Sequence, residues 1–444
     1  MKESAFHAND IRGIYPSEID ENLAYNIGFA FANKTGADKM FIGRDIRRSS
    51  KSLTRACVKG IRAAGCSVLD LGLSDTPALY FATGKHNLPG IMITASHNPP
   101  KYNGIICVLP NAITLEGSEL KDLTNYITHA KAKKSGKYEK QNIKKEYEKH
   151  VLSHINRKVL KPLKIVIDTS NGMATLYVKD IFAQFPAKII PLFWKLDGRF
   201  PHHLPDSSLS DNLRDLQKSV LTNHADFGII FDGDADRAAF VDEKGEIVPA
   251  SCTASLLAEH LLSKEHGKVL YNVISSKILP ETIKSLGGIA LLEKIGHTYM
   301  KKRMHSEKAL FGAEEYGHYY FKSNYYADSG LIAALLMYDI LSEASFPLSF
   351  LIKRYKKYYK PEGIMIQTHD KVLATSQVTA WCEKRKPQKI ENFDGTTYFY
   401  IDYWINVRAS NTEPVIRITL EADGEKTGKK IENELRMFIK QQDL

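Results

Sequence analysis

Three aspartates at alternate positions are the residues with the clearest capacity for chemistry. Asp232, Asp234 and Asp236 directly follow an apolar run at residues 228–231 that is typical of a buried strand. Carboxylates this close repel one another, so something positive must lie among them. Oxygen-only ligands suit a hard cation, with Mg²⁺ as the first candidate. Arg237 adds a fixed cation that can grip a phosphoryl group through two parallel hydrogen bonds.

Residues 232–237 leave other interpretations open. An EF-hand loop requires glycine at its sixth position, where this chain has Arg237, and helices rather than a strand on either side; Glu243 at the twelfth position is then a coincidence. In an aspartyl-phosphate phosphatase, Asp232 would itself be the nucleophile. A solvated acidic turn is the third alternative, although D-x-D-x-D directly after an apolar strand makes a poor surface turn.

A second candidate reactive group is Ser96, in the segment Thr94–Pro99 (TASHNP) that follows a short apolar strand at residues 91–93. Junctions between strand and loop are where sites usually lie in α/β proteins. No Gly-x-Ser-x-Gly elbow surrounds Ser96, so a hydrolase-type nucleophile is not indicated. A serine without an activating base can still transfer a group that it already carries, such as phosphate. The alternative is an ordinary polar turn.

Two loops further along the chain could bind the two ends of a sugar phosphate. Residues 312–318 (GAEEYGH) combine glycines, carboxylates and a histidine, which can bind vicinal hydroxyls and move a proton; a polar turn is the alternative. Residues 408–414 (RASNTEP) offer a guanidinium, hydroxyls, an amide and loop N–H groups, which make a good cradle for a dianion. Residues 296–299 and the basic run 301–303 are weaker signals, and the basic run is also typical of a solvated helix face.

The elements that must position these loops repeat one plan of strand, polar loop, helix and strand. The copies place strands at 40–42 and 67–69, at 165–167 and 189–190, and at 269–271 and 290–292, with helices at 53–64, 178–182 and 280–286. Three such blocks predict three related α/β domains with mostly parallel sheets. Later strands at 397–400 and 404–407 and an amphipathic helix at 425–440 predict a smaller α+β domain. We expect domain boundaries that give 1–143, 144–246, 247–360 and 361–444.

Composition excludes several classes of protein. With 444 residues, 43% of them hydrophobic and 25% charged, the chain has the makeup of a globular protein with an ample core. The net charge of +10 is dispersed and no nucleic-acid-reading motif is visible; the densest patch, residues 131–149, alternates Lys with Glu and Gln and is typical of a solvated linker that leads into a helix. We expect no nucleic-acid partner, and a cleft that attracts small phosphorylated molecules.

The cysteines and the apolar segments indicate a cellular compartment. Five cysteines without a C-x-x-C pair argue against a disulfide framework or a zinc site and for a reducing environment. No secretory signal is visible at the N-terminus, and the longest apolar stretch is too short to span a bilayer. We therefore expect a cytoplasmic protein with no membrane partner.

Together these motifs resemble the α-D-phosphohexomutase superfamily, and within it the bacterial phosphomannomutase/phosphoglucomutase branch. The resemblance spans nearly the whole chain and adds Asp10–Gly13, Tyr102–Gly104, Phe200–His203 and Lys294–His297 to the segments above. The order and spacing of the motifs make it specific. The fold that it implies has four domains around a central cleft, three of them α/β and the last α+β.

The resemblance also implies roles for individual residues. Ser96 would carry the phosphate and, with Asp232, Asp234 and Asp236, would hold Mg²⁺. The implied catalytic residues are Ser96, Arg12, His97, Arg237, His297 and His318. The implied substrate-binding residues are Glu314, Tyr316, Gly317, His318, Lys294, His297, Arg408, Ser410, Asn411 and Thr412. Phospho-Ser96 would donate to a hexose phosphate and give a hexose 1,6-bisphosphate, which is the intermediate and activator.

Four positions depart from the family pattern. Ile106 and Ile274 stand where the family usually has lysine, with Lys277 close to the second, Tyr316 replaces a serine, and Asn9 replaces an aromatic residue. The metal and phosphate ends are intact, so we expect phosphotransfer to be retained and sugar preference or rate to change.

We therefore predict a cytoplasmic, Mg²⁺-dependent phosphohexomutase that acts on mannose or glucose phosphates as a monomer or small homo-oligomer. The rivals are a phosphoglucosamine mutase, a sugar-phosphate-binding homologue with reduced turnover, and a phosphatase that uses Asp232.

Overall fold

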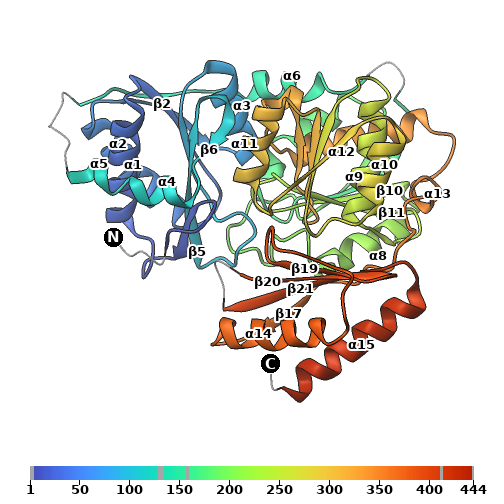
Figure 1. Ribbon diagram of the computed structural model, residues 1–444. Helices are drawn as coiled ribbons and strands as arrows, with labels where there is room; N and C mark the ends of the chain where they lie inside the picture. The colour runs from blue at the N-terminus through green and yellow to red at the C-terminus, as the bar shows by residue number, and fades with distance from the viewer. Residues whose placement is uncertain (1–4, 129–134, 157–159, 411–413, 443–444) are drawn as a thin grey trace.

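The computed structural model describes residues 5–128, 135–156, 160–410 and 414–442, and it contains four β-sheets that follow one another along the chain (Figure 1). We name each sheet, together with its helices, domain I to domain IV. Domains I to III share the plan of a parallel centre with antiparallel strands at an edge, and domain IV is entirely antiparallel.

Domain I is built on a seven-stranded sheet with the order β1-β5-β4-β2-β3-β7, and β6 pairs with β5. Strands β3, β2 and β4 are parallel because helices connect them, whereas β5 and β1 are antiparallel. The strands are β1 (Ile11–Ile14), β2 (Lys39–Arg44), β3 (Ser67–Leu73), β4 (Gly90–Ile93), β5 (Tyr102–Leu109), β6 (Ile113–Thr114) and β7 (Tyr138–Lys140). The helices are α1 (Glu21–Thr35), α2 (Ser50–Ala63), α3 (Thr76–His86), α4 (Gly117–Asp122) and α5 (Asn125–Thr128).

Domain II has a five-stranded sheet with the order β12-β11-β10-β8-β9, in which β10, β8 and β9 are parallel. Strand β10 is buried along its whole length, so its end delivers the loop that follows it to a fixed place. The elements are α6 (Lys144–Leu152), β8 (Lys164–Asp168), α7 (Val178–Phe182), β9 (Lys188–Leu192), α8 (Arg214–Asn223), β10 (Phe227–Phe231), β11 (Ala238–Asp242) and β12 (Ile247–Val248).

Domain III has a four-stranded sheet with the order β14-β13-β15-β16. Its last two strands form an antiparallel hairpin whose loop holds residues 314–318. The elements are α9 (Ala250–Leu262), β13 (Lys268–Asn272), α10 (Ile278–Ser285), β14 (Ile289–Glu293), α11 (His297–Glu307), β15 (Phe311–Ala313), β16 (Tyr319–Phe321), α12 (Gly330–Glu343) and α13 (Leu348–Lys353). Ser329 caps the N-terminus of α12, because its side chain accepts a hydrogen bond from the N–H of Ile332.

Domain IV is an antiparallel sheet with the order β17-β21-β20-β19-β18. Helices α14 and α15 cover the face of this sheet that points away from the other domains (Figure 1). The elements are β17 (Ile364–Gln367), α14 (Lys371–Glu383), β18 (Lys389–Glu391), β19 (Thr396–Phe399), β20 (Tyr403–Ala409), β21 (Val415–Ala422) and α15 (Glu425–Gln441).

The buried apolar side chains of the described residues form five clusters, of which one spans several domains. One continuous cluster of buried side chains contains residues from domains I, II and III, for example Phe81, Phe231 and Leu335. Domain IV packs around a cluster of its own, which includes Trp381, Ile405 and Leu435. Domains I to III therefore share apolar interfaces, whereas domain IV is independently packed.

The predicted fold class is confirmed: three α/β domains with parallel sheets precede an α+β domain. The helix expected at 178–182 has these bounds, and the helix expected at 53–64 begins three residues earlier. Part of the expected linker at 131–149 is a strand, because β7 pairs with the edge strand β3 and satisfies its backbone; residues 131–134 of that linker lie outside the described part. Among the described residues, no helix has the length and apolar character needed to cross a bilayer.

Candidate active site

Ser96 lies in the loop that follows the carboxyl end of β4, an inner strand of the domain I sheet. Its side chain is 4% exposed, and its backbone has a φ of 46°, in the left-handed region that side chains rarely adopt. The hydroxyl donates a hydrogen bond to Oδ2 of Asp232 at 2.8 Å, and the Ser96 N–H donates to Oγ1 of Thr94 at 2.9 Å. The structure thus brings the predicted serine against the first of the three predicted aspartates, across a domain boundary.

The three aspartates lie together in the loop after β10. Their carboxylate oxygens come within 4.8 Å of one another, and all three residues are buried. Burial, with the neighbouring Asp234 adding to it, raises the pKa of Asp232 to about 8, and burial together with Asp234 raises the pKa of Asp236. Oδ1 of Asp234 and Oδ1 of Asp236 accept no hydrogen bond from the described residues. Buried, crowded and unsatisfied oxygens fit a hard divalent cation.

Gly233 explains how the two loops come so close. A Cβ atom at this position would lie 2.4 Å from the main-chain oxygen of Ser96, well inside any allowed contact. Only a residue without a side chain lets the aspartate loop pack directly on the serine loop.

A chain of polar contacts leads from Ser96 into domain III. His97 Nδ1 lies 3.2 Å from Ser96 Oγ and accepts a hydrogen bond from Arg237 Nη2 at 2.7 Å. The Nε–H of Arg237 is donated to Nε2 of His318 at 2.9 Å. Burial, followed by the charge of Arg237, holds the pKa of His97 well below its usual range, so this ring is neutral and can accept. His97, Arg237 and His318 therefore form one connected group beside Ser96.

Arg47 is a residue of the site that the sequence did not reveal. Its guanidinium is fully buried and donates to the main-chain oxygens of Ser96 (2.7 Å), Asn98 (2.6 Å), Pro99 (2.8 Å) and Tyr102 (3.2 Å). The remaining N–H, on Nε, is donated to Asp45 at 3.1 Å. All five donors are used, so Arg47 holds the serine loop in shape.

The serine loop has further supports on both sides. The ring of Phe200, from the expected Phe200–His203 motif of domain II, lies 5.0 Å from the Arg47 guanidinium. Arg12, on β1, hydrogen-bonds the side chains of Asp10 and Asn98. Arg12 thus contacts the serine loop through Asn98.

His297 lies near the other end of this group. It begins α11, and its ring centroid is 6.4 Å from that of His318. Burial, followed by the charge of Lys301, holds the pKa of His297 well below its usual range. Its Nδ1 is buried without a hydrogen-bond partner among the described residues.

The hairpin loop between β15 and β16 carries the predicted sugar-binding residues. Glu314 is buried, and its carboxylate accepts from the N–H of Gly296 at 2.8 Å and from the Tyr320 hydroxyl. Gly317 has a φ of 86°, and a Cβ there would lie 2.8 Å from the oxygen of Ala238, so glycine is required where the loop meets β11. Asn272 Nδ2 also donates to Oε1 at 3.3 Å, so three protein donors fix the carboxylate, and one lone pair of Oε2 is left for a substrate hydroxyl.

Domain IV presents a cluster of cations at the predicted phosphate loop. Arg408 and Arg417 are directly opposite each other on β20 and β21, and the Lys371 ammonium donates to the oxygen of Ser410 at 2.8 Å. Like charges at opposite positions destabilise a sheet unless an anion lies between them. Arg417 was not predicted. Asn411 and Thr412 lie outside the described residues.

Lys294 and Tyr316 lie where domains III and IV meet. The Lys294 ammonium is 5.8 Å from the ring of Phe393 in domain IV, and the Tyr316 ring is 6.0 Å from the Arg417 guanidinium. Both predicted substrate residues thus belong to the boundary between the hairpin loop and the domain IV cations.

Comparisons with known proteins match this arrangement along the whole chain. Four family profiles, described as phosphoglucomutase/phosphomannomutase alpha/beta/alpha domains I, II and III and C-terminal domain, match residues 3–134, 145–245, 250–358 and 368–437. A phosphomannomutase of Methanocaldococcus jannaschii is 35% identical over 98% of this chain and 97% of its own. The chain belongs to the phosphoglucomutase/phosphomannomutase family.

Further members differ in the sugar for which they are named. A phosphoglucomutase of Neisseria meningitidis is 33% identical over 98% of this chain and 96% of its own. A solved phosphoglucomutase/phosphomannomutase family protein from Burkholderia thailandensis has a TM-score of 0.89 at 29% identity and covers 99% of this chain and 98% of its own. The chain is therefore a phosphohexomutase, and its preferred sugar is a separate question.

The positions that depart from the family pattern have different surroundings. Ile106 is 3% exposed and belongs to the core shared by domains I to III, and Ile274 is also buried. The ammonium of Lys277 pairs with Asp423 of domain IV, so it is committed to the boundary between domains III and IV. Asn9 lies against Gly296 of the loop that leads to His297.

Proposed function

We propose that this phosphohexomutase interconverts the 6- and 1-phosphates of mannose or glucose through phospho-Ser96 and a hexose 1,6-bisphosphate. The observation that carries the proposal is the contact of the Ser96 hydroxyl with Asp232, 2.8 Å away in a cluster of three buried carboxylates. A phosphate on Ser96 would enter this cluster, and only a cation could make that favourable. Asp232, Asp234 and Asp236 would hold Mg²⁺. When bound, this cation would neutralise negative charge on the transferring phosphoryl group.

The protein's own groups serve the transfer as follows. Phosphoryl transfer depends mainly on in-line placement and charge stabilisation. Arg47 holds the serine loop, and Arg237 and Arg12 place guanidinium groups beside it. The P–O bond to Oγ of Ser96 breaks as a bond to a sugar hydroxyl oxygen forms. The sugar hydroxyl gives up its proton, and Oγ of Ser96 takes up a proton and becomes a hydroxyl again. Nδ1 of the neutral His297 ring, which has no hydrogen-bond partner among the described residues, is the candidate acceptor of the sugar proton.

The second half of the reaction returns the other phosphate to Ser96. The bisphosphate must present its opposite end, so one distant anchor has to accept a phosphate attached to either carbon. The cations of domain IV, Arg408, Arg417 and Lys371, suit this task because they recognise charge and not sugar shape. The Tyr316 ring beside Arg417 can contact the hexose where the family has a serine.

In the phosphatase alternative the phosphate would be carried by Asp232 and Ser96 would stay unmodified. The two residues are in direct contact, since Oδ2 of Asp232 accepts from the Ser96 hydroxyl at 2.8 Å, so the position of the covalent phosphate separates the two mechanisms. We also propose a reducing compartment, the cytoplasm, because all five cysteines lie in the described part of the chain, are buried and form no disulfide with one another.

Peptide mapping by mass spectrometry tests the proposal. We expect phosphate on Ser96 of the purified protein, and loss of mutase activity in Ser96→Ala. Assays with mannose, glucose and glucosamine phosphates identify the sugar and separate the phosphoglucosamine mutase alternative. An unphosphorylated Ser96 together with a fully active Ser96→Ala enzyme would refute the mechanism; binding of sugar phosphates without turnover would favour the binding homologue.

A further inference from the structure

A buried ion pair between Lys301 and Asp328 lies beside His318 and takes no part in the proposed phosphoryl transfer. The Lys301 ammonium lies 3.4 Å from Oδ1 of Asp328, and both side chains are completely buried. The same ammonium lies 3.8 Å from the ring centroid of Tyr80, on α3 of domain I. Burying two charges costs a desolvation free energy that often exceeds their attraction, so such a pair calls for a role other than stability.

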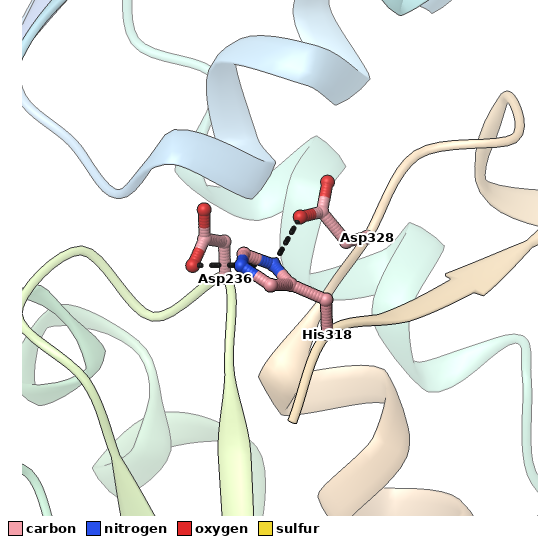
Figure 2. A group of neighbouring side chains, drawn as sticks. All are labelled: Asp236, His318 and Asp328. Atoms are coloured by element: carbon pink, nitrogen blue, oxygen red, sulfur yellow. Dashed lines mark hydrogen bonds and ion pairs between the residues drawn. The ribbon is translucent and has the colours of Figure 1, made fainter. Parts of the chain in front are cut away.

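Asp328 makes a second contact that determines the state of His318 (Figure 2). Its Oδ2 lies 2.7 Å from Nδ1 of His318. A carboxylate only accepts, so Nδ1 carries the proton. Nε2 of the same ring then has a lone pair, which accepts the Nε–H of Arg237 at 2.9 Å. The opposite tautomer would point an N–H at the Arg237 N–H and leave Nδ1 facing the carboxylate without a proton.

Asp236, His318 and Asp328 also have the spacing of a metal site, since their donor atoms lie within 4.8 Å of one another (Figure 2). Two protein cations already meet this group, however: Lys301 pairs with Asp328, and Arg237 occupies Nε2 of His318. These contacts commit Asp328 and His318 to protein cations, and they leave Asp236 to the cluster that it forms with Asp232 and Asp234.

We propose that Lys301 and Asp328 are positioning residues of the phosphotransfer centre, which hold His318 in its Nδ1–H tautomer and thereby fix Arg237 beside His97 and Ser96. The inference rests on the proposed function of Ser96. It assigns His318 the work of a fixed acceptor for Arg237, because both nitrogens of its ring are engaged with protein groups.

The charges along this chain are consistent with that arrangement. Burial raises the pKa of Asp328, but the Lys301 ammonium and the His318 ring outweigh burial and hold its pKa below the usual range, so Asp328 is ionised. Lys301 comes from α11, Arg237 directly precedes β11, and the Tyr80 ring of domain I lies against the Lys301 ammonium. Contacts from domains I, II and III therefore act together to orient the guanidinium of Arg237.

The state of His318 can be observed directly by NMR of the full-length protein labelled with ¹⁵N-histidine, with the signal identified from its absence in His318→Gln. We expect a protonated Nδ1 and a bare Nε2 in the wild-type protein. We expect this signature to be lost in Lys301→Met/Asp328→Asn, a double variant that removes both charges together and leaves no unpaired ion. A wild-type Nε2–H tautomer, or an unchanged signature in the double variant, would overturn the proposal.

Kinetics give a second, independent readout. In the double variant, we expect kcat to fall on the order of 100-fold with KM changed by less than about threefold, because a misaligned guanidinium affects the transfer step more than binding. Lys301→Arg keeps the charge and should retain most of the activity. Asp339→Asn is the matched control: this aspartate is also buried in domain III and lies 3.5 Å from His260, away from the chain of contacts, so kcat should not change.

The outcomes separate this inference from the proposed function. An active Ser96→Ala enzyme would refute the proposed function. The protonation of the two ring nitrogens of His318 is measured by NMR without substrate, so its result does not depend on that function. Wild-type kcat in the double variant would overturn the positioning role of Lys301 and Asp328 while leaving phospho-Ser96 intact.

Discussion

Replacing Arg47 should disable the serine loop more than any other single change outside the reacting residues. Its side chain makes five hydrogen bonds, four to main-chain oxygens of residues 96–102 and one to Asp45. Lysine keeps the charge but has three donors in place of five and no planar fork. At about 1 kcal/mol for each hydrogen bond lost, Arg47→Lys should lower the free energy of unfolding by about 2 kcal/mol.

The effect on activity should exceed the effect on stability. A displacement of roughly 1 Å in a reacting group costs on the order of 100-fold in rate, and Arg47 contacts the carbonyl of Ser96 itself. Urea denaturation measures the change in the free energy of unfolding, and initial rates measure the change in kcat. Arg48→Lys is the matched control, because Arg48 is adjacent and exposed, and changes at such sites usually stay within about 0.5 kcal/mol. If Arg47→Lys matched this control in both kcat and free energy of unfolding, the proposed role of Arg47 in holding the serine loop would be refuted.

Three further changes test other parts of the site. Gly233→Ala should push the aspartate loop away from Ser96 and lower kcat, whereas Gly424→Ala, where a Cβ meets open space, should have no such effect. The raised pKa of Asp232, about 8 against about 4 in an unfolded chain, contributes stability that is lost as the pH rises through 8. The rise in Tm produced by Mg²⁺ over EDTA should therefore be larger at pH 8.5 than at pH 6.5. Tyr316→Ser should change the ratio of activities on mannose and glucose phosphates.

Each of these expectations has a result that would contradict it. Equal kcat values for the two glycine variants would show that the loops can separate without loss. A Tm shift that is equal or smaller at pH 8.5 would mean that protons do not compete with the cation at the aspartates. An unchanged ratio of activities in Tyr316→Ser would exclude the tyrosine from sugar selection.

The groups that were predicted from sequence are those whose chemistry is local. The three aspartates and Ser96 each follow an apolar strand, and strand ends are where parallel sheets gather side chains. Arg47 could not be found in this way, because its partners are carbonyl oxygens of another loop, and every residue type has a carbonyl. Its role depends on folded geometry and not on the identity of the residues that it contacts.

The role of Lys301 was hard to predict because its neighbours in the sequence are also basic. Its neighbours Lys302 and Arg303 make the segment look like a solvated helix face, yet Lys301 is fully buried. It lies one helical turn after His297, so the two share a face of α11, and that spacing was a usable signal. Asp328 carried no comparable pattern, because its contacts are to His318 and Lys301 across the tertiary fold.

The separate core of domain IV bears on the proposed turnover of a hexose bisphosphate. Polar contacts connect this domain to domain III, such as the N–H of Ile295 with Asp394 and the Lys277 ammonium with Asp423, whereas the apolar cluster of domain IV contains no residue of the other domains. The proposed phosphate anchor is therefore packed separately from the core that domains I to III share. A shift of domain IV against domain III would exchange such polar contacts for contacts with water and would leave the apolar cluster of domain IV buried, so the fold would allow the anchor to adjust to a substrate at a low cost in free energy.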